Sequence, residues 1–289
     1  MFSFCTDPST LPDWQWWACY LTTGKHLAFY ASFGTVLLLL ALAAPAALAL
    51  GLAGALAARS TNPLLAWPGR IYTAMVRGVP DIIFFLFVPL ALDQLFEIIR
   101  HRIKCPDWEQ PIWQGNDFVV CPAAKLPLSS APQWVHEVYG FTLALIAFAI
   151  VFGAFAANTL RGAMDAVPKG QIEAAEAYGF SRGQIIRRIL LPQMWIYALP
   201  GLGNLWQILI KATPLLFLLG VEDVVYWAKE LGSSKTSAFA YPHPDWRLWY
   251  FLALLVWYLG LTKISEAVFA RLDARVSRGI VTVKGGNGA

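Results

Sequence analysis

The segment Val167–Pro192 (the docking segment) has the residue types of a surface that binds a soluble partner. A helical pattern begins after Pro168, and Gly179 interrupts it. Ser181 can cap a second short helix, which carries three arginines among isoleucines and leucines until Pro192 ends it. Because strongly apolar segments flank this polar run, we expect two amphipathic helices on a membrane surface, placed between transmembrane helices.

The chain lacks the sequence patterns of common catalytic sites. No glycine-rich run leads into Gly-Lys-Ser or Gly-Lys-Thr, as an ATP-binding P-loop would require. The patterns HExxH and GxSxG are also absent, and so is a clustered pair of carboxylates within an apolar segment. We therefore expect no catalytic residue, no cofactor and no metal in this chain. A membrane-embedded enzyme is a weak hypothesis for the same reason.

Polar side chains within the apolar segments form a second group of candidates, because a polar group in lipid costs free energy. Asn158, Lys211 and Thr213 lie in such segments. Asp81 ends the sequence Arg77–Asp81, which interrupts the second apolar segment and predicts a broken or bent helix there. A helical break at Pro214 would free backbone carbonyls, which suits a substrate site at the membrane midplane or a bend in a gate. We place these four residues on a substrate path. The alternatives are a buried ion pair for Lys211 and an interhelical hydrogen bond for Asn158.

The composition is typical of a membrane protein with several spans. Of the 289 residues, 57% are hydrophobic and 14% are charged, whereas a soluble domain has about 25% charged residues. Five apolar runs are long enough to cross a hydrocarbon core of ~30 Å as helices. The first run comes too late and is too long for a signal peptide. We predict an all-α membrane protein whose five transmembrane helices cover residues 29–57, 72–96, 138–160, 194–220 and 246–270.

Lysine and arginine residues in the loops predict the orientation, because these residues are enriched on the cytoplasmic side. Most of them precede the second apolar run, lie in the 161–193 loop or follow the fifth run. This places the 161–193 loop and the 281–289 tail in the cytoplasm, and residues 1–28 and the 99–135 loop outside. The net charge of +4 follows this topology and does not indicate binding of nucleic acid. Residues 29–280 form the transmembrane domain.

Four cysteines indicate the same orientation independently. All of them fall on the predicted outer segments, where disulfides persist, and none falls in a cytoplasmic loop or in a span. The local pairings are Cys5–Cys19 and Cys105–Cys121, although three connectivities are possible. A zinc site and four unpaired thiols are the alternatives, and the lack of a Cys-x-x-Cys pattern disfavours zinc.

The docking segment resembles the EAA loop of ABC importer membrane subunits. Its motif residues stand at the spacing of that family: Glu173-Ala174-Ala175, Gly179, Ile189 and Leu191-Pro192. The resemblance implies that the segment forms a coupling helix, which sits in a groove of a separate ATP-hydrolysing subunit. The residues expected at this contact are Glu173, Ala174, Ala175, Gly179 and Arg182. The alternative is an ordinary pair of interfacial amphipathic helices.

Further motifs extend the resemblance to the polar amino-acid permeases, of which the histidine, lysine-arginine-ornithine and opine importers are closest in character. The match covers roughly residues 29–98 and 138–280, with the motifs Arg77-Gly78-Val79-Pro80-Asp81, Arg161-Gly162-Ala163, Val167-Pro168-Lys169-Gly170, Tyr197-Ala198-Leu199-Pro200 and Leu219–Val225. It implies a MetI-like five-span core in the lipid of the bacterial inner membrane. It also implies a second permease subunit, identical or paralogous, a periplasmic substrate-binding protein, and ATPase subunits that bind ATP and Mg.

Two departures from the family pattern concern the substrate and its delivery. Related permeases for basic amino acids often have a glutamate where this chain has Asn158, and an amide cannot supply that charge. Neutral polar amino acids such as glutamine therefore remain an alternative to basic amino acids, histidine or opines. The 99–135 loop is longer than is usual, which would enlarge the docking face for the binding protein or only cover the pore mouth. An ATP-independent secondary transporter is a weaker alternative, because the spans show no internal repeat.

Overall fold

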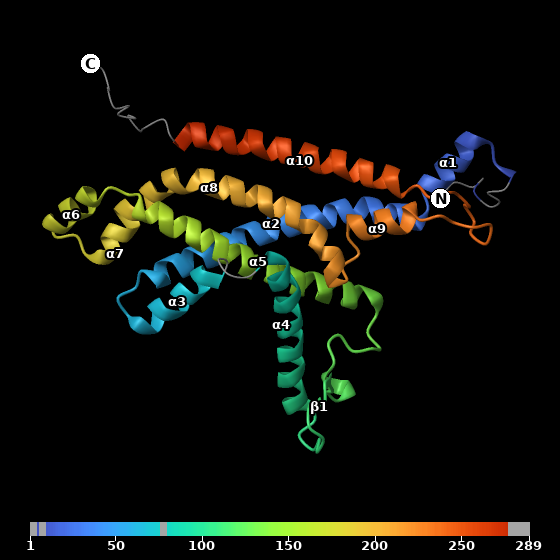
Figure 1. Ribbon diagram of the computed structural model, residues 1–289, viewed down its shortest axis with the longest axis horizontal. Helices are drawn as coiled ribbons and strands as arrows, with labels where there is room; N and C mark the ends of the chain where they lie inside the picture. Colours follow the sequence, from blue (N-terminus) through green and yellow to red (C-terminus); the bar gives the residue numbers. More distant parts are fainter. Residues whose placement is uncertain (1–4, 6–9, 76–79, 277–289) are drawn as a thin grey trace. The chain divides into compact units, whose positions relative to one another are not determined.

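The computed structural model describes Cys5 and residues 10–75 and 80–276, and its regular structure is almost entirely helical (Figure 1). The long helices are α2 (Gly24–Ala58), α4 (Asp81–Lys104), α5 (Gln133–Asp165), α8 (Leu191–Ala212) and α10 (Arg247–Val276). The short helices are α1 (Asp13–Leu21), α3 (Pro63–Met75), α6 (Lys169–Ala177), α7 (Arg182–Ile185) and α9 (Val224–Gly232). The remaining elements are the 3-10 helices η2 (Pro122–Ala124) and η4 (Thr213–Leu219), the π-helical turn η3 (Ile186–Leu190), and the antiparallel strands β1 (Trp113–Gln114) and β2 (Asp117–Phe118).

Within the described residues, five helical segments are long and apolar enough to cross a membrane, which confirms the predicted number of spans. Four of them cover nearly all of a predicted span, at Gly24–Ala58, Gln133–Asp165, Arg182–Leu219 and Arg247–Val276. The first two extend beyond both predicted ends, the third begins earlier than predicted, and the fourth ends later. The fifth lies at Ile82–Lys104 rather than at 72–96. Pro80 stands just before α4, where its missing N–H is tolerated, so the helix begins after it. The helix break expected around Arg77 falls mostly on residues 76–79, which lie outside the described residues.

The end of α4 also differs from the prediction, because the helix continues into the segment assigned to the 99–135 loop. Its last turn contains His101, Arg102 and Lys104. Lysine and arginine are good helix formers, and cations near a helix C-terminus interact favourably with its dipole. The charged residues after position 96 therefore end the apolar run, but the helix continues through them to Lys104.

The chain divides into two compact units. Unit 1 comprises Met1–Ala46, Gly78–Val151 and Lys211–Trp257, and unit 2 comprises Ala47–Arg77, Phe152–Ile210 and Tyr258–Ala289. The helices α2, α5 and α10 each contribute one part to each unit. All four cysteines belong to unit 1, and the docking segment belongs to unit 2.

Unit 2 is held together by close packing of small side chains. A Cβ atom added at Gly51 of α2 would lie 2.7 Å from the Cβ of Ala156 on α5, and one added at Gly153 would lie 3.0 Å from the Cβ of Leu50. Small residues of this kind let membrane helices approach closely and gain van der Waals contact. The buried cluster continues from these helices into the docking segment, and comprises Ala55, Ala157, Leu160, Ala163, Met164, Val167, Leu190, Met194 and Ala198.

Unit 1 contains two disulfides, one of them beside a buried aromatic cluster. The structure joins Cys5 to Cys19 and Cys105 to Cys121, so that all four thiols are paired. The imidazole of His101 lies close to the sulfurs of the second pair. Because a disulfide leaves no thiolate to bind a metal, this trio does not form the zinc site considered as an alternative. Next to Cys19, the ring of Tyr20 packs in the aromatic cluster with Trp16, Tyr241 and Trp246.

Candidate functional site

The docking segment forms the two short helices that the sequence predicts, α6 and α7. Gly179 joins them with a φ of 76°, in the left-handed region where an L side chain is strained. A Cβ atom at this position would meet nothing within 4 Å, so the backbone angle alone requires glycine. Just after the turn, the backbone N–H of Ser181 donates to Oε1 of Gln184 at 2.8 Å, as in a capping box. Local residues therefore fix the angle between the two helices.

The sequence predicts that the second helix ends at Pro192, but in the structure the chain remains helical beyond this residue. The chain passes from α7 through η3 into α8 and stays helical throughout, so that Arg182–Leu219 is one continuous segment. A π-helical turn shifts the backbone hydrogen bonds by one residue, which accommodates the missing N–H of Pro192. The arginines of the docking segment are thereby joined rigidly to a membrane helix.

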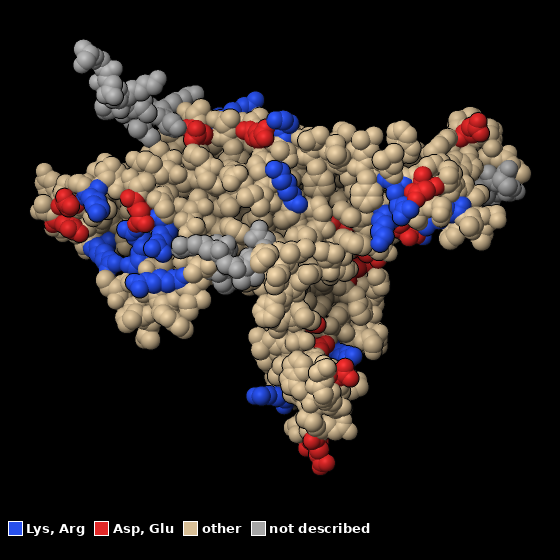
Figure 2. All heavy atoms as spheres, in the orientation of Figure 1, with Lys and Arg blue, Asp and Glu red and all other residues tan. Residues whose placement is uncertain are grey.

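The EAA residues face in two directions. Ala175 is buried, whereas Glu173 and Ala174 are exposed. Tyr178 at the end of α6 is 84% exposed. It was not among the residues predicted for this site, although an aromatic residue directly before a turn glycine is a signal that the sequence contains. Figure 2 shows charged side chains of both signs gathered over α6 and α7. An exposed aromatic side chain among charged groups is a common anchor of protein interfaces.

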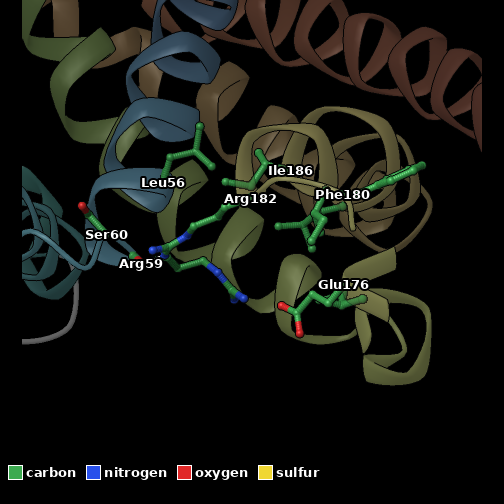
Figure 3. Close-up of a pocket in the computed structure, with 10 residues that line it drawn as sticks. Leu56, Arg59, Ser60, Glu176, Phe180, Arg182 and Ile186 are labelled. Atoms are coloured by element: carbon green, nitrogen blue, oxygen red, sulfur yellow. Dashed lines mark hydrogen bonds between the residues drawn. The ribbon is translucent and has the colours of Figure 1, made fainter. Parts of the chain in front are cut away.

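A cavity of about 730 Å³ lies between the docking segment and the end of α2 (Figure 3). Its charged lining residues are Arg59, Glu176 and Arg182, and Figure 3 shows the two arginines beside each other and Glu176 apart from them. The other lining residues are Leu56, Ser60, Ile172, Phe180, Ile185, Ile186 and Leu190.

Arg182 connects α7 to the loop between α2 and α3. Its guanidinium donates to Oγ1 of Thr61 at 3.0 Å and to the carbonyl oxygen of Arg59 at 3.1 Å. The Arg59 side chain in turn pairs with the carboxylate of Asp165, the last residue of α5. We name Arg59, Thr61, Asp165 and Arg182 the arginine clamp. The sequence predicted Arg182 as a docking residue, but its partners are more than 100 positions away in the chain, and no local pattern indicated them.

The predicted substrate-path residues divide between the two units. Asn158 is exposed on α5 in unit 2, and Lys211 is exposed near the end of α8 in unit 1. Neither side chain has a hydrogen bond or an ion pair within the described part of the chain, so Lys211 does not form the buried ion pair considered above. Thr213 is buried. It is the first residue of η4, since α8 ends at Ala212, beside the break that the sequence predicts at Pro214. The side chain of Asp81 lies outside the described residues.

Comparison with known proteins identifies the family. Residues 50–278 match the family of binding-protein-dependent transport system inner membrane components. The chain belongs to this family. The permease is 34% identical over 235 residues to the histidine/lysine/arginine/ornithine transport system permease protein HisQ of Salmonella typhimurium, covering 81% of this chain and 86% of HisQ. It is 32% identical over 214 residues to the arginine ABC transporter permease protein ArtQ of Escherichia coli, covering 74% of this chain and 80% of ArtQ.

A solved structure shows the same fold for the permease. The crystal structure of an amino acid ABC transporter with histidines matches it with a TM-score of 0.61 at 20% identity, over 92% of this chain and 99% of the other. Family membership confirms the resemblance that the sequence motifs indicated. The members of this family are transport components of the inner membrane and not enzymes, which agrees with the missing catalytic motifs.

Proposed function

We propose that the permease is the membrane subunit of an ATP-driven importer of basic amino acids, histidine or opines. The substrates in the names of HisQ and ArtQ support the first two classes, and the motifs shared with opine importers support the third. The observation that carries the proposal is the docking segment. Its EAA residues Glu173 and Ala174 are exposed beside Tyr178, at a turn that Gly179 fixes.

The docking segment would fit a groove of an ATPase subunit, which would bind ATP and Mg. Closure of two such subunits would move α6 and α7 together, because Gly179 and the Ser181 cap fix the angle between them. The movement would reach α8 directly through η3. It would reach α2 and α5 through the arginine clamp, whose hydrogen bonds and ion pair connect α7 with the ends of both helices. Each of these connections lies within unit 2.

The proposed orientation has the N-terminus outside and the docking segment and C-terminus in the cytoplasm. Its support is the distribution of residues along the chain, because both disulfides form in the predicted outer segments and the docking segment is rich in arginine. Disulfides persist outside the cytoplasm, and ATP is inside it. A periplasmic binding protein would deliver the substrate. The substrate would then pass between this permease and a second permease subunit, identical or paralogous.

A neutral polar amino acid such as glutamine is the second candidate substrate, and Asn158 is the observation that favours it. The amide is exposed on α5 and carries no charge for a cationic side chain. Replacing Asn158 by glutamate would add a negative charge at this position of α5.

Uptake into proteoliposomes distinguishes these substrates. The permease with its co-purifying subunits and binding protein would be supplied with arginine, lysine, histidine, glutamine and octopine, as wild type and as Asn158→Glu. We expect the wild type to take up at least one cationic amino acid or octopine in the presence of ATP. Uptake of glutamine alone, with cationic uptake appearing only in the glutamate variant, would favour the neutral substrate and place Asn158 on its path.

A further inference from the structure

Unit 1 contains a cavity of about 470 Å³ that the docking segment does not share. It lies among the first turns of α2, the start of α5 and the turn that leads into α9. Ligand sites in proteins commonly measure ~300–1,000 Å³ and combine apolar walls with a few convergent polar groups. Trp227 and Phe141 contribute to the apolar walls, and the polar lining residues are Ser32, Thr35, Gln133, His136, Glu137 and Glu222.

Glu222 is held by a turn whose two ends are fixed. On one side, Gly220 ends η4 in the left-handed region, with a φ of 75°. On the other side, Oδ1 of Asp223 accepts hydrogen bonds from the backbone N–H groups of Val225 at 3.0 Å and Tyr226 at 2.9 Å, and so caps α9. Because this backbone is already ordered, little conformational entropy would be lost when a ligand binds the Glu222 side chain.

The two glutamates of the cavity form no ion pair with a lysine or arginine of the described chain, and His136 is the titratable base that lines the cavity with them. Neither Glu137 nor Glu222 makes a hydrogen bond or an ion pair within the residues that the structure describes. Burial raises the pKa of Glu222, and the charge of Glu137 raises it further. Both effects disfavour the carboxylate, and a bound cation would oppose both.

Another glutamate of unit 1 shows the opposite arrangement. Glu230 binds the ammonium groups of Lys25 at 2.7 Å and Lys235 at 3.1 Å. The hydrogen bond from Lys25 lowers the pKa of Glu230, although burial opposes the shift. Among the described residues of unit 1, two lysines pair with Glu230 and no lysine or arginine pairs with the carboxylates of the cavity, which leaves them available to a cation from outside the chain.

We propose that this cavity binds the cationic side chain of the transported amino acid, with Glu137 and Glu222 as charge partners and Trp227 as an aromatic wall. Carboxylates form strong charge-assisted hydrogen bonds with guanidinium and ammonium groups, and an indole face attracts the same cations. The inference rests on the proposed function. It assigns to unit 1 the recognition of positive charge that Asn158 cannot supply, and the proposed orientation places the start of α5 on the side from which substrate arrives.

Arginine binding and arginine uptake would test this assignment with three variants of the complete transporter. The double variant Glu137→Gln/Glu222→Gln keeps the side-chain shapes and removes both charges, and Trp227→Leu removes the aromatic wall. The matched control is Glu109→Gln, because Glu109 is an exposed glutamate of unit 1 that does not line the cavity. Binding of arginine would be measured on the purified transporter in detergent without binding protein, and uptake in proteoliposomes with it. Thermal unfolding of each variant would show that it is folded.

We expect the double variant to bind arginine about tenfold more weakly or worse, and Trp227→Leu to weaken binding less. The Glu109→Gln control should bind arginine in detergent as the wild type does, because Glu109 does not line the cavity. Unaltered arginine binding by a folded double variant would overturn the inference. Normal arginine binding with weakened affinity for the binding protein would also overturn it, and would assign the cavity to basic residues of that protein. If the wild type transported no amino acid, the proposed function would fail, and the binding measurement would still decide on the cavity by itself.

Discussion

At the scale of single residues, Gly179 sets the angle between α6 and α7 through its backbone conformation. A β-branched side chain in the left-handed region costs about 1–2 kcal/mol, and the cheapest relief is a change in the turn. We expect Gly179→Val to abolish ATP-dependent uptake while the protein still reaches the membrane. Uptake and immunoblotting of membranes would measure both effects.

The control for this variant is Gly162→Val, which places the same side chain in open space on α5, with nothing within 4 Å of its Cβ and no left-handed backbone. Uptake by this control should remain close to that of the wild type. Normal uptake by Gly179→Val would show that the docking segment does not need its present shape.

The titration of Asp223 should make the free energy of unfolding depend on pH. Its side chain is fully buried, and burial raises its pKa from 3.8 to about 6, although the backbone hydrogen bonds of Tyr226 and Val225 oppose this. Because the folded state has the higher pKa, it gains stability as the pH falls from above 6 toward 3.8 and loses it as the pH rises again. Oδ1 accepts the capping bonds and Oδ2 has no partner among the described residues, so protonation of Oδ2 leaves the cap in place.

Asp223→Asn keeps the cap and removes the titration. Relative to this variant, the wild type should gain about 1.4 kcal/mol of stability when the pH falls from 7.5 to 5, because pH 5 lies about one unit below the folded pKa of about 6. Thermal unfolding in detergent at both pH values would measure the difference. An equal effect of pH on the two proteins would show that Asp223 keeps an ordinary pKa.

At the scale of elements, the arginine clamp connects α7 to the ends of α2 and α5. Arg182→Gln removes the guanidinium that bonds to Thr61 and to the Arg59 carbonyl. Each such bond contributes about 0.5–1.5 kcal/mol at most, so we expect the transporter to assemble and to hydrolyse ATP at its basal rate. The stimulation of hydrolysis by loaded binding protein should be lost, since the movement of α7 no longer reaches α2.

Arg187→Gln is the matched control for the clamp. Arg187 is also exposed on the docking segment and has no hydrogen bond or ion pair within the described chain. Its replacement removes the same charge and should leave stimulation unchanged. If both variants lost stimulation equally, the positive charge of the docking segment would matter and the clamp would not.

Local patterns account for the elements that the sequence predicted correctly. The five spans follow from uninterrupted apolar runs, and the turn between α6 and α7 follows from Gly179 and Ser181. The continuation of the helix through Pro192 was not predictable, because it depends on the π-helical turn η3. The clamp and the Glu137–Glu222 cavity were not predictable either, because each joins residues that are distant in the chain.

At the scale of the whole molecule, the orientation can be tested through the cysteines. If residues 1–28 and the 99–135 loop lie outside, both disulfides should form in the cell, and reduced thiols should be absent from freshly isolated protein. Alkylation of denatured protein, with and without prior reduction, would count them by mass. We expect four modified cysteines only after reduction. Four thiols that react without reduction would place the cysteine-bearing segments in the reducing cytoplasm and contradict the orientation.

The dependence of arginine uptake on ATP tests the central claim most directly. Proteoliposomes that contain the complete transporter would be loaded with ATP and Mg, with a non-hydrolysable ATP analogue or with neither, and given binding protein and arginine outside. The account predicts uptake only with hydrolysable ATP and no effect of dissipating the ion gradients. Uptake that continues without ATP and stops when the ion gradients are dissipated would contradict it, and would identify a secondary transporter.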